Sequence, residues 1–259
     1  MNILILGIDE PFYSRKLYTE LADLLYKNGH NVKHFYNIPG TLNKKRISAE
    51  LKVYGLVRFV LRGAKYLLSK LRKPSYQVFS DRGIPVHTVD DLNDAKFINE
   101  IKRQKPDITL SINTPKRFSK GLISVSGNII NVHFGMLPKY RGLYPIYWAL
   151  KNNEKQIGIT VHKVDPDIDC GSIVQQDTIN VEGRDIAKLY EEAFSILPYT
   201  ILRAITKIEQ GSKHKQNDDS KSSYYSYPKL AAKDKILFFL EIFASALIFL
   251  IIFLLIFLI

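Results

Sequence analysis

The sequence predicts an α/β fold: an open, mostly parallel twisted sheet with helices on its faces, followed by one C-terminal transmembrane helix. Three observations support this prediction. They are a β-α-β pattern at the N-terminus, the same strand–helix rhythm repeated to about residue 179, and an almost purely apolar C-terminal stretch. We therefore expect a folded domain over residues 1–205, a polar linker over 206–235 and the transmembrane helix over 236–259.

The N-terminal elements follow directly from the residue pattern. Residues 2–7 are a short β-rich run, and residues 14–28 carry leucines at helical spacing before a stop at Gly29. Residues 31–36 alternate as a second strand, and a β-α-β opening is typical of a parallel sheet. Further strands are predicted at 84–87, 107–112, 128–132, 157–164 and 173–179, with helices at 92–104 and 118–124.

Residues 51–73 interrupt this rhythm with a basic amphipathic helix that contains no acidic residue. Such a helix can lie on an anionic membrane surface, so we include it as a possible membrane contact. The alternative is a helix that covers the domain and exposes its basic face to solvent.

The C-terminal residues predict a membrane anchor. No charged residue occurs in 242–259, and the apolar run extends back to 236 across Glu241, which gives the length that a helix needs to span a bilayer. Lysines just before this run predict that the folded domain lies on the cytoplasmic side. We therefore expect a single-pass membrane protein, with a buried core helix as the alternative.

Charge and cysteine content narrow the classes of partner. The net charge of +12 favours nucleic acid, anionic lipid or phosphorylated substrates. The chain has neither zinc-ligand spacing nor an arginine-rich tract, so we expect no nucleic-acid partner. Cys170 is the only cysteine, which rules out an intramolecular disulfide.

Two short segments carry groups suited to acyl transfer. Asn131 and His133 lie two residues apart on a strand and so point to the same face. The asparagine amide can donate to an oxyanion, and a histidine can transfer a proton near neutral pH. Residues 165–171 place three carboxylates in one turn, whose negative field should raise the pKa of a nearby histidine. Taken alone, each segment also fits an ordinary polar pair or an ordinary turn.

Taken together and in order, residues 131–142, 158–162 and 165–171 resemble the folate-dependent formyltransferase family. That family includes glycinamide-ribonucleotide, methionyl-tRNA and sugar-amine N-formyltransferases. The resemblance implies a Rossmann-like formyltransferase fold and the transfer of a formyl group from 10-formyltetrahydrofolate to an amine, without a metal. By position, it implies Asn131, His133 and Asp169 as the catalytic residues.

The resemblance also implies folate contacts. The Ser-Leu-Leu-Pro segment of the family falls on Gly135, Met136, Leu137 and Pro138, so glycine replaces serine at its first position. We include Asp165, the first carboxylate of the acidic turn, among the folate contacts.

The acceptor is expected to be an amino sugar. Residues 141–150 and 224–228 are more similar to the sugar-amine branch than to the purine branch, and their aromatic rings suit stacking on a base or sugar as well as simple packing. Residues 179–236 leave no room for the second domain of the tRNA enzymes. We therefore expect a nucleotide-linked or lipid-linked sugar amine as the small-molecule partner.

The sequence leaves three other functions open. The same residues could hydrolyse 10-formyltetrahydrofolate, or the chain could be an inactive, membrane-tethered relative that only binds. A nucleotide-binding or glycosyl-transfer protein is the third, although no glycine-rich phosphate loop follows the first strand.

Overall fold

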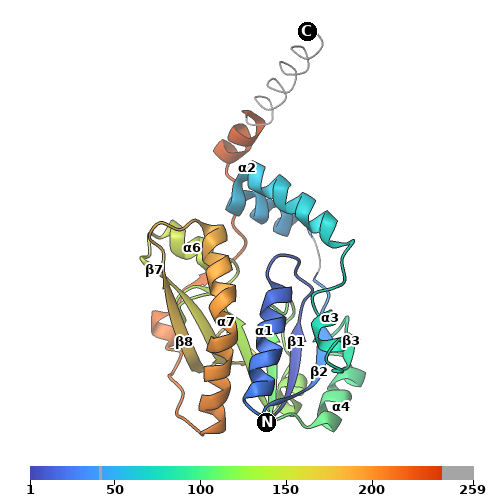
Figure 1. The fold of residues 1–259 in the computed structure, drawn as a ribbon. Coiled ribbons are helices and arrows are strands. Elements are labelled where there is room, and N and C mark those ends of the chain that lie inside the picture. Colours follow the sequence, from blue (N-terminus) through green and yellow to red (C-terminus); the bar gives the residue numbers. More distant parts are fainter. Residues whose placement is uncertain (41–42, 241–259) are drawn as a thin grey trace. The chain divides into compact units, whose positions relative to one another are not determined.

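The computed structural model describes residues 1–40 and 43–240. A seven-stranded sheet with the order β3-β2-β1-β4-β5-β7-β8 forms its centre (Figure 1). Its strands are β1 (Asn2–Gly7), β2 (Asn31–Asn37), β3 (Val86–Thr88), β4 (Ile108–Ile112), β5 (Asn128–His133), β7 (Gln156–Lys163) and β8 (Ile173–Asn180). The helices are α1 (Ser14–Lys27), α2 (Lys44–Ser69), α3 (Gln77–Ser80), α4 (Ala95–Gln104), α5 (Lys120–Val125), α6 (Pro145–Lys151) and α7 (Ile186–Glu209).

The sheet is parallel over its first five strands and antiparallel at one end. β1 lies parallel to both β2 and β4, β2 pairs in parallel with β3, and β4 with β5. β7 runs antiparallel to both β5 and β8. The predicted open, mostly parallel sheet is confirmed, and its strands lie within a few residues of the predicted ranges, as do α1, α4 and α5. The long helix α7 was not predicted.

Helices cover both faces of the sheet. α1 and α7 lie side by side over one face (Figure 1). On the other face, α4 and α5 close a core of mutually packed residues: Leu4, Leu6, Tyr36, Ile38, Leu92, Phe97, Ile101 and Leu122. Residues 3–7 of β1 are all buried. A strand that is buried on both faces needs apolar residues at successive positions, which explains the unbroken run of isoleucine and leucine over residues 3–6.

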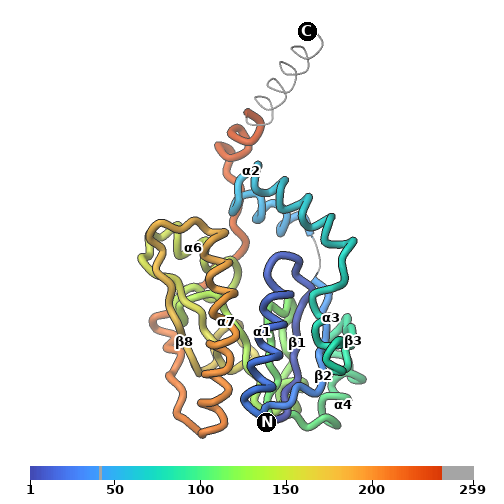
Figure 2. The backbone as a smooth tube through the Cα atoms, in the orientation of Figure 1, coloured from blue at the N-terminus to red at the C-terminus, as the bar shows by residue number. Residues whose placement is uncertain are grey.

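The chain after α7 returns to the sheet. Figure 2 shows the backbone turning back at the end of α7 and running along the outer strand β8. Ile173, the first residue of β8, exchanges two backbone hydrogen bonds with Lys215, of 2.8 and 3.0 Å. A two-stranded parallel sheet then joins β6 (Arg141–Gly142) to β9 (Tyr224–Tyr225). Part of the range predicted as a linker is therefore paired with the domain, and the domain boundaries stay a prediction.

The chain divides into two units, Met1–Thr41 with Tyr66–Ser226, and Leu42–Lys65 with Tyr227–Ile259. Within the second unit, Lys52 Nζ lies 2.6 Å from Asp234 Oδ1. α2 contains a non-helical residue at Gly55, where φ is 73°. The helix predicted over 51–73 thus extends from Lys44 to Ser69 in the structure and is kinked at Gly55.

The predicted transmembrane helix needs correction. Within residues 1–40 and 43–240, no helix has both the length and the apolar character to cross a bilayer. Residues 232–240 are helical, and this stretch contains Lys233, Asp234 and Lys235. The rest of the predicted span, 241–259, lies outside the described residues. The prediction of a membrane localisation with a cytoplasmic domain depended on this helix and is corrected with it, and no finding supports a membrane contact of residues 51–73.

Candidate active site

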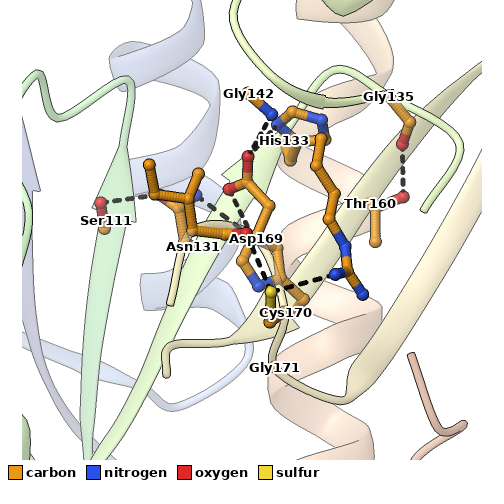
Figure 3. A network of polar contacts seen from close by, with 12 residues as sticks. Ser111, Asn131, His133, Gly135, Gly142, Thr160, Asp169, Cys170 and Gly171 are labelled. Atoms are coloured by element: carbon orange, nitrogen blue, oxygen red, sulfur yellow. Dashed lines mark hydrogen bonds and ion pairs between the residues drawn. The ribbon is translucent and has the colours of Figure 1, made fainter. Parts of the chain in front are cut away.

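The three predicted catalytic residues, Asn131, His133 and Asp169, lie close together (Figure 3). Asn131 and His133 lie on β5, and Asp169 lies in the loop between β7 and β8. The antiparallel register of β5 and β7 places His162 directly opposite Asn131. Directly opposed residues share a face of the sheet, so His162 joins the site.

The contacts of His133 define its resting tautomer. The ring is buried, with 6% of its surface exposed, and its Nε2 lies 2.7 Å from the carbonyl oxygen of Tyr140. A carbonyl only accepts hydrogen bonds, so we assign the ring hydrogen to Nε2. In the neutral ring, Nδ1 therefore carries the lone pair, and it faces Asp169 Oδ2 at 3.5 Å.

The two largest effects on the pKa of His133 oppose each other. Burial lowers the pKa, and the neighbouring Asp169 carboxylate raises it by less, so the pKa lies below its ordinary value. The acidic turn was predicted to raise this pKa. The carboxylate has that effect, but the net prediction is wrong because burial outweighs it. The neutral ring is therefore the resting form near neutral pH.

The pKa of Asp169 is lowered. Burial alone would raise it, but the neighbouring His133 and His162 rings and the backbone N–H of Gly142 together favour the carboxylate. The Gly142 N–H donates to Asp169 Oδ2 over 2.8 Å. Asp169 therefore stays ionised beside a neutral His133 and is ready to stabilise an imidazolium.

Acid is expected to destabilise the fold in two separate pH ranges. The folded pKa of His133 lies below 6.5, so the unfolded chain binds more protons once the pH falls below that value, and stability decreases. The pKa of Asp169 lies below 3.8, so its contribution is present above 3.8 and is lost as the pH falls towards the folded pKa. Thermal unfolding from pH 8 to pH 3 follows the first range in full and the onset of the second. His133→Gln should reduce the decrease that begins near pH 6.5, and an unchanged decrease would contradict the assignment.

Asn131 is oriented by its neighbours. The Ser111 hydroxyl donates to Asn131 Oδ1 over 2.8 Å (Figure 3). This leaves Nδ2 as the end that faces His162 Nε2 at 3.3 Å. His162 Nδ1 lies 2.7 Å from the carbonyl of Lys163, so Nδ1 carries the hydrogen and Nε2 accepts. His162 Nε2 also lies 3.5 Å from Asp169 Oδ1. His162 Nε2 therefore lies between the Asn131 amide and the Asp169 carboxylate.

Sequence reasoning missed Ser111 and His162 as site residues. His162 lies within the segment that carries the family resemblance, but only the strand register reveals that it opposes Asn131. Ser111 is the cross-strand partner of Asn131 on the parallel neighbour β4. Residues two apart on a predicted strand can be identified from one sequence, whereas pairing between strands cannot.

The predicted folate segment follows directly after β5. The Thr160 hydroxyl donates to the carbonyl of Gly135 over 2.6 Å, and Gln176 Nε2 donates to the carbonyl of Leu137 over 3.0 Å. The Leu137–Pro138 peptide is cis. Met136 and Pro138 are half-buried, and Asp165 is exposed in the loop that leads to Asp169. In the described part of the chain no hydrogen bond joins Asp165 to residues 135–138.

A pocket of about 270 Å³ lies beside this segment. Gly135 and Met136 line it together with residues of α6 and the start of β7. Asn131, His133 and Asp169 are not among its lining residues, so this pocket is distinct from the point where the three meet.

Glycine at position 135 is explained by a close approach. A Cβ atom there would lie 2.5 Å from His133 Nε2 and 2.9 Å from the Tyr140 carbonyl oxygen. Gly135→Ser should therefore break the hydrogen bond that fixes the His133 tautomer, lower turnover, and destabilise the fold by about 1–3 kcal/mol. Gly63→Ser is the matched control, because a Cβ at Gly63 meets no described atom within 4 Å. Steady-state kinetics and thermal unfolding measure both variants, and equal behaviour of the two would refute this explanation.

The aromatic residues near the site are largely stacked on one another. Tyr225 stacks on Trp148 at 4.9 Å between ring centroids and on Tyr140 at 5.4 Å. Tyr224 remains 58% exposed. This arrangement favours packing as the role of Trp148 and Tyr225, which was one of the two predicted roles.

Comparison with known proteins identifies the family. The formyl transferase family model matches residues 60–203, more than half of the chain. The bifunctional polymyxin resistance protein ArnA of Wigglesworthia glossinidia brevipalpis is 34% identical over 173 residues, which are 64% of this chain and 25% of that protein. Methionyl-tRNA formyltransferase of Kosmotoga olearia is 32% identical over 167 residues, which are 63% of this chain and 53% of that protein. This chain thus spans between a quarter and about half of the length of these relatives.

A solved structure shares the fold. The N-formyltransferase from Helicobacter canadensis, in complex with folinic acid and dTDP-3-aminofucose, aligns with a TM-score of 0.60 at 20% identity, covering 88% of this chain and 72% of that one. At this identity the likeness shows the fold alone. The family model and the relatives confirm the predicted resemblance and the predicted class of enzyme, a formyltransferase. The chain belongs to the formyl transferase family.

Proposed function

We propose that this chain transfers a formyl group from 10-formyltetrahydrofolate to a primary amine, with Asn131, His133 and Asp169 as the catalytic residues. The observation that carries the proposal is the Nδ1 edge of His133. Its Nε2 edge is closed by a 2.7 Å hydrogen bond to Tyr140, whereas Nδ1 faces Asp169 Oδ2 at the longer distance of 3.5 Å. The other carboxylate oxygen of Asp169 lies 3.5 Å from His162 Nε2, which the Asn131 amide also faces. A base, a donor and an anion are thus gathered at one point.

The proposed reaction uses each group once. The amine nitrogen attacks the formyl carbon, and the carbonyl oxygen becomes an oxyanion. An amide has two N–H donors, so Asn131 can satisfy His162 with one and the oxyanion with the other. His133 Nδ1 takes the amine proton, and Asp169 stabilises the resulting imidazolium. The proton then passes to the folate nitrogen as the carbon–nitrogen bond breaks, which yields the formamide and tetrahydrofolate.

We propose that the folate lies against residues 135–138 and the acidic turn that begins at Asp165. The support is positional, because these residues follow β5 and precede Asp169 directly. Backbone groups of Gly135 and Leu137 are held by side chains of β7 and β8, which fixes the segment beside His133. A rigid segment loses little entropy when it binds a ligand.

We propose a nucleotide-linked amino sugar as the acceptor. Two observations support this class over a purine or a tRNA. The Helicobacter canadensis protein, which shares the fold, was solved with dTDP-3-aminofucose. The basic surplus of the chain also suits a phosphorylated acceptor.

A formyl-transfer assay tests the proposal. The full chain is supplied with 10-formyltetrahydrofolate and, in parallel, with a panel of amino-sugar nucleotides, glycinamide ribonucleotide and methionyl-tRNA. Transfer to an amino-sugar nucleotide that is lost in His133→Ala would support the proposed reaction and acceptor. Transfer only to glycinamide ribonucleotide or to tRNA would refute the acceptor class. Formate release without an acceptor would identify a hydrolase and refute transfer.

A further inference from the structure

Asn217 lies in the returning segment after α7, at the back of the catalytic turn. Only 6% of its surface is exposed. Its Nδ2 donates to the backbone carbonyls of Asp169, over 2.7 Å, and of Gly171, over 3.0 Å. One buried amide thus uses both of its N–H groups on the two carbonyls that flank Cys170.

Arg141 fixes which way this amide points. Its Nη2 lies 2.9 Å from Asn217 Oδ1, and a guanidinium can only donate. The oxygen of Asn217 must therefore face Arg141, and its nitrogen must face the turn. Arg141 is buried, and its Nη1 contacts Cys170 Sγ at 3.1 Å and Asp219 Oδ1 at 2.8 Å. The orientation of the Asn217 amide is thus fixed from both ends.

The turn needs such support because Asp169 has an unfavourable backbone conformation. Its φ is 53°, in the left-handed region, which is unfavourable for a non-glycine residue and persists only where the surroundings enforce it. The two hydrogen bonds from Asn217 hold the backbone carbonyls of Asp169 and Gly171, the residues on either side of Cys170. On the opposite side, the carboxylate of Asp169 is held by the Gly142 N–H.

We infer that Asn217 is a positioning residue, which holds the backbone of Asp169 in the conformation that presents its carboxylate to His133. The inference rests on the proposed function for its effect on turnover. The segment that provides Asn217 is tied to the domain on both sides, through Lys215 to Ile173 and through β9 to β6. Residues that sequence patterning assigns to a linker therefore form part of the active-site framework.

Two measurements on Asn217→Ala test the inference. The first is the kcat and KM of formyl transfer. We expect kcat to fall by about 10- to 100-fold, as for loss of groups that orient reacting residues, with a smaller change in KM. The second is the pKa of the His133 ring, measured by NMR of its ring nitrogens. The titratable groups that affect this pKa are Asp169 and His162. A displaced Asp169 carboxylate should lower the pKa in the same direction as Asp169→Asn.

Asn93→Ala is the matched control. Asn93 also joins two loop segments, donating to the Arg117 carbonyl over 3.0 Å and accepting from Ser119 N–H over 2.8 Å, but its hydrogen bonds do not involve the catalytic turn. It should leave the His133 pKa unchanged. An unchanged His133 pKa in folded Asn217→Ala would overturn the inference, even if its melting temperature fell. Because the NMR measurement needs no turnover, failure of the proposed reaction would leave this test intact.

Discussion

His133→Ala is expected to lower kcat by about 10²- to 10⁴-fold, the range for loss of a group that transfers a proton in the transition state. His133 is the buried base whose Nδ1 lone pair faces Asp169, and its Nε2 hydrogen is held by the Tyr140 carbonyl. Removing the ring deletes the proton acceptor and leaves Asp169 without the imidazolium that it stabilises. Single-turnover formyl transfer with saturating folate and acceptor measures the loss.

Two further variants separate catalysis from folding. His30 is as buried as His133, at 6% exposure each, and it lies just before β2. His30→Ala therefore controls for the loss of a buried ring and should keep wild-type kcat per folded molecule. His133→Gln replaces the ring with a side-chain amide, which can still donate a hydrogen bond but cannot take a proton. Substantial turnover in His133→Gln would show that position 133 acts only as a donor and would contradict its role as base.

The sequence allowed most of the sheet to be predicted because each of its strands has a local signature. Period-two alternation and apolar runs define strands, and the β-α-β order implies parallel pairing. The pair Asn131 and His133 could be predicted to share a face for the same local reason. Asp169 came from the family resemblance, since nothing local distinguishes it from Asp165 and Asp167 in the same turn.

The parts that could not be predicted depend on contacts between distant segments. His162 and Ser111 enter the site through strand register, and Asn217 enters through a returning segment whose polar composition resembles a linker. The sign of the His133 pKa shift also depends on burial, which the positions of neighbouring carboxylates in a sequence do not reveal. The transmembrane prediction rested on the apolar length of 236–259 and on the lysines before it, and within residues 1–40 and 43–240 no helix has the length and apolar character to cross a bilayer.

Asp169→Asn is expected to lower kcat by a similar factor, about 10²- to 10⁴-fold, and to leave the fold intact. The amide has the shape of the carboxylate, so its oxygen can still accept from the Gly142 N–H and its nitrogen can donate to His162 Nε2. What disappears is the negative charge beside His133. The imidazolium formed during proton transfer then lacks its counter-ion in a buried site, where charge is costly.

The pH dependence of Asp169→Asn distinguishes this electrostatic role from simple disruption. The Asp169 carboxylate raises the pKa of His133 against the larger effect of burial. Its removal should lower that pKa, so the basic form of His133 persists to lower pH. The acid limb of the kcat/KM profile should therefore move to lower pH while the plateau falls. Asp167→Asn makes the same change at an exposed position of the same turn and should alter neither the plateau nor the limb. An acid limb that stays in place in Asp169→Asn would mean that His133 is not the group titrating in the free enzyme.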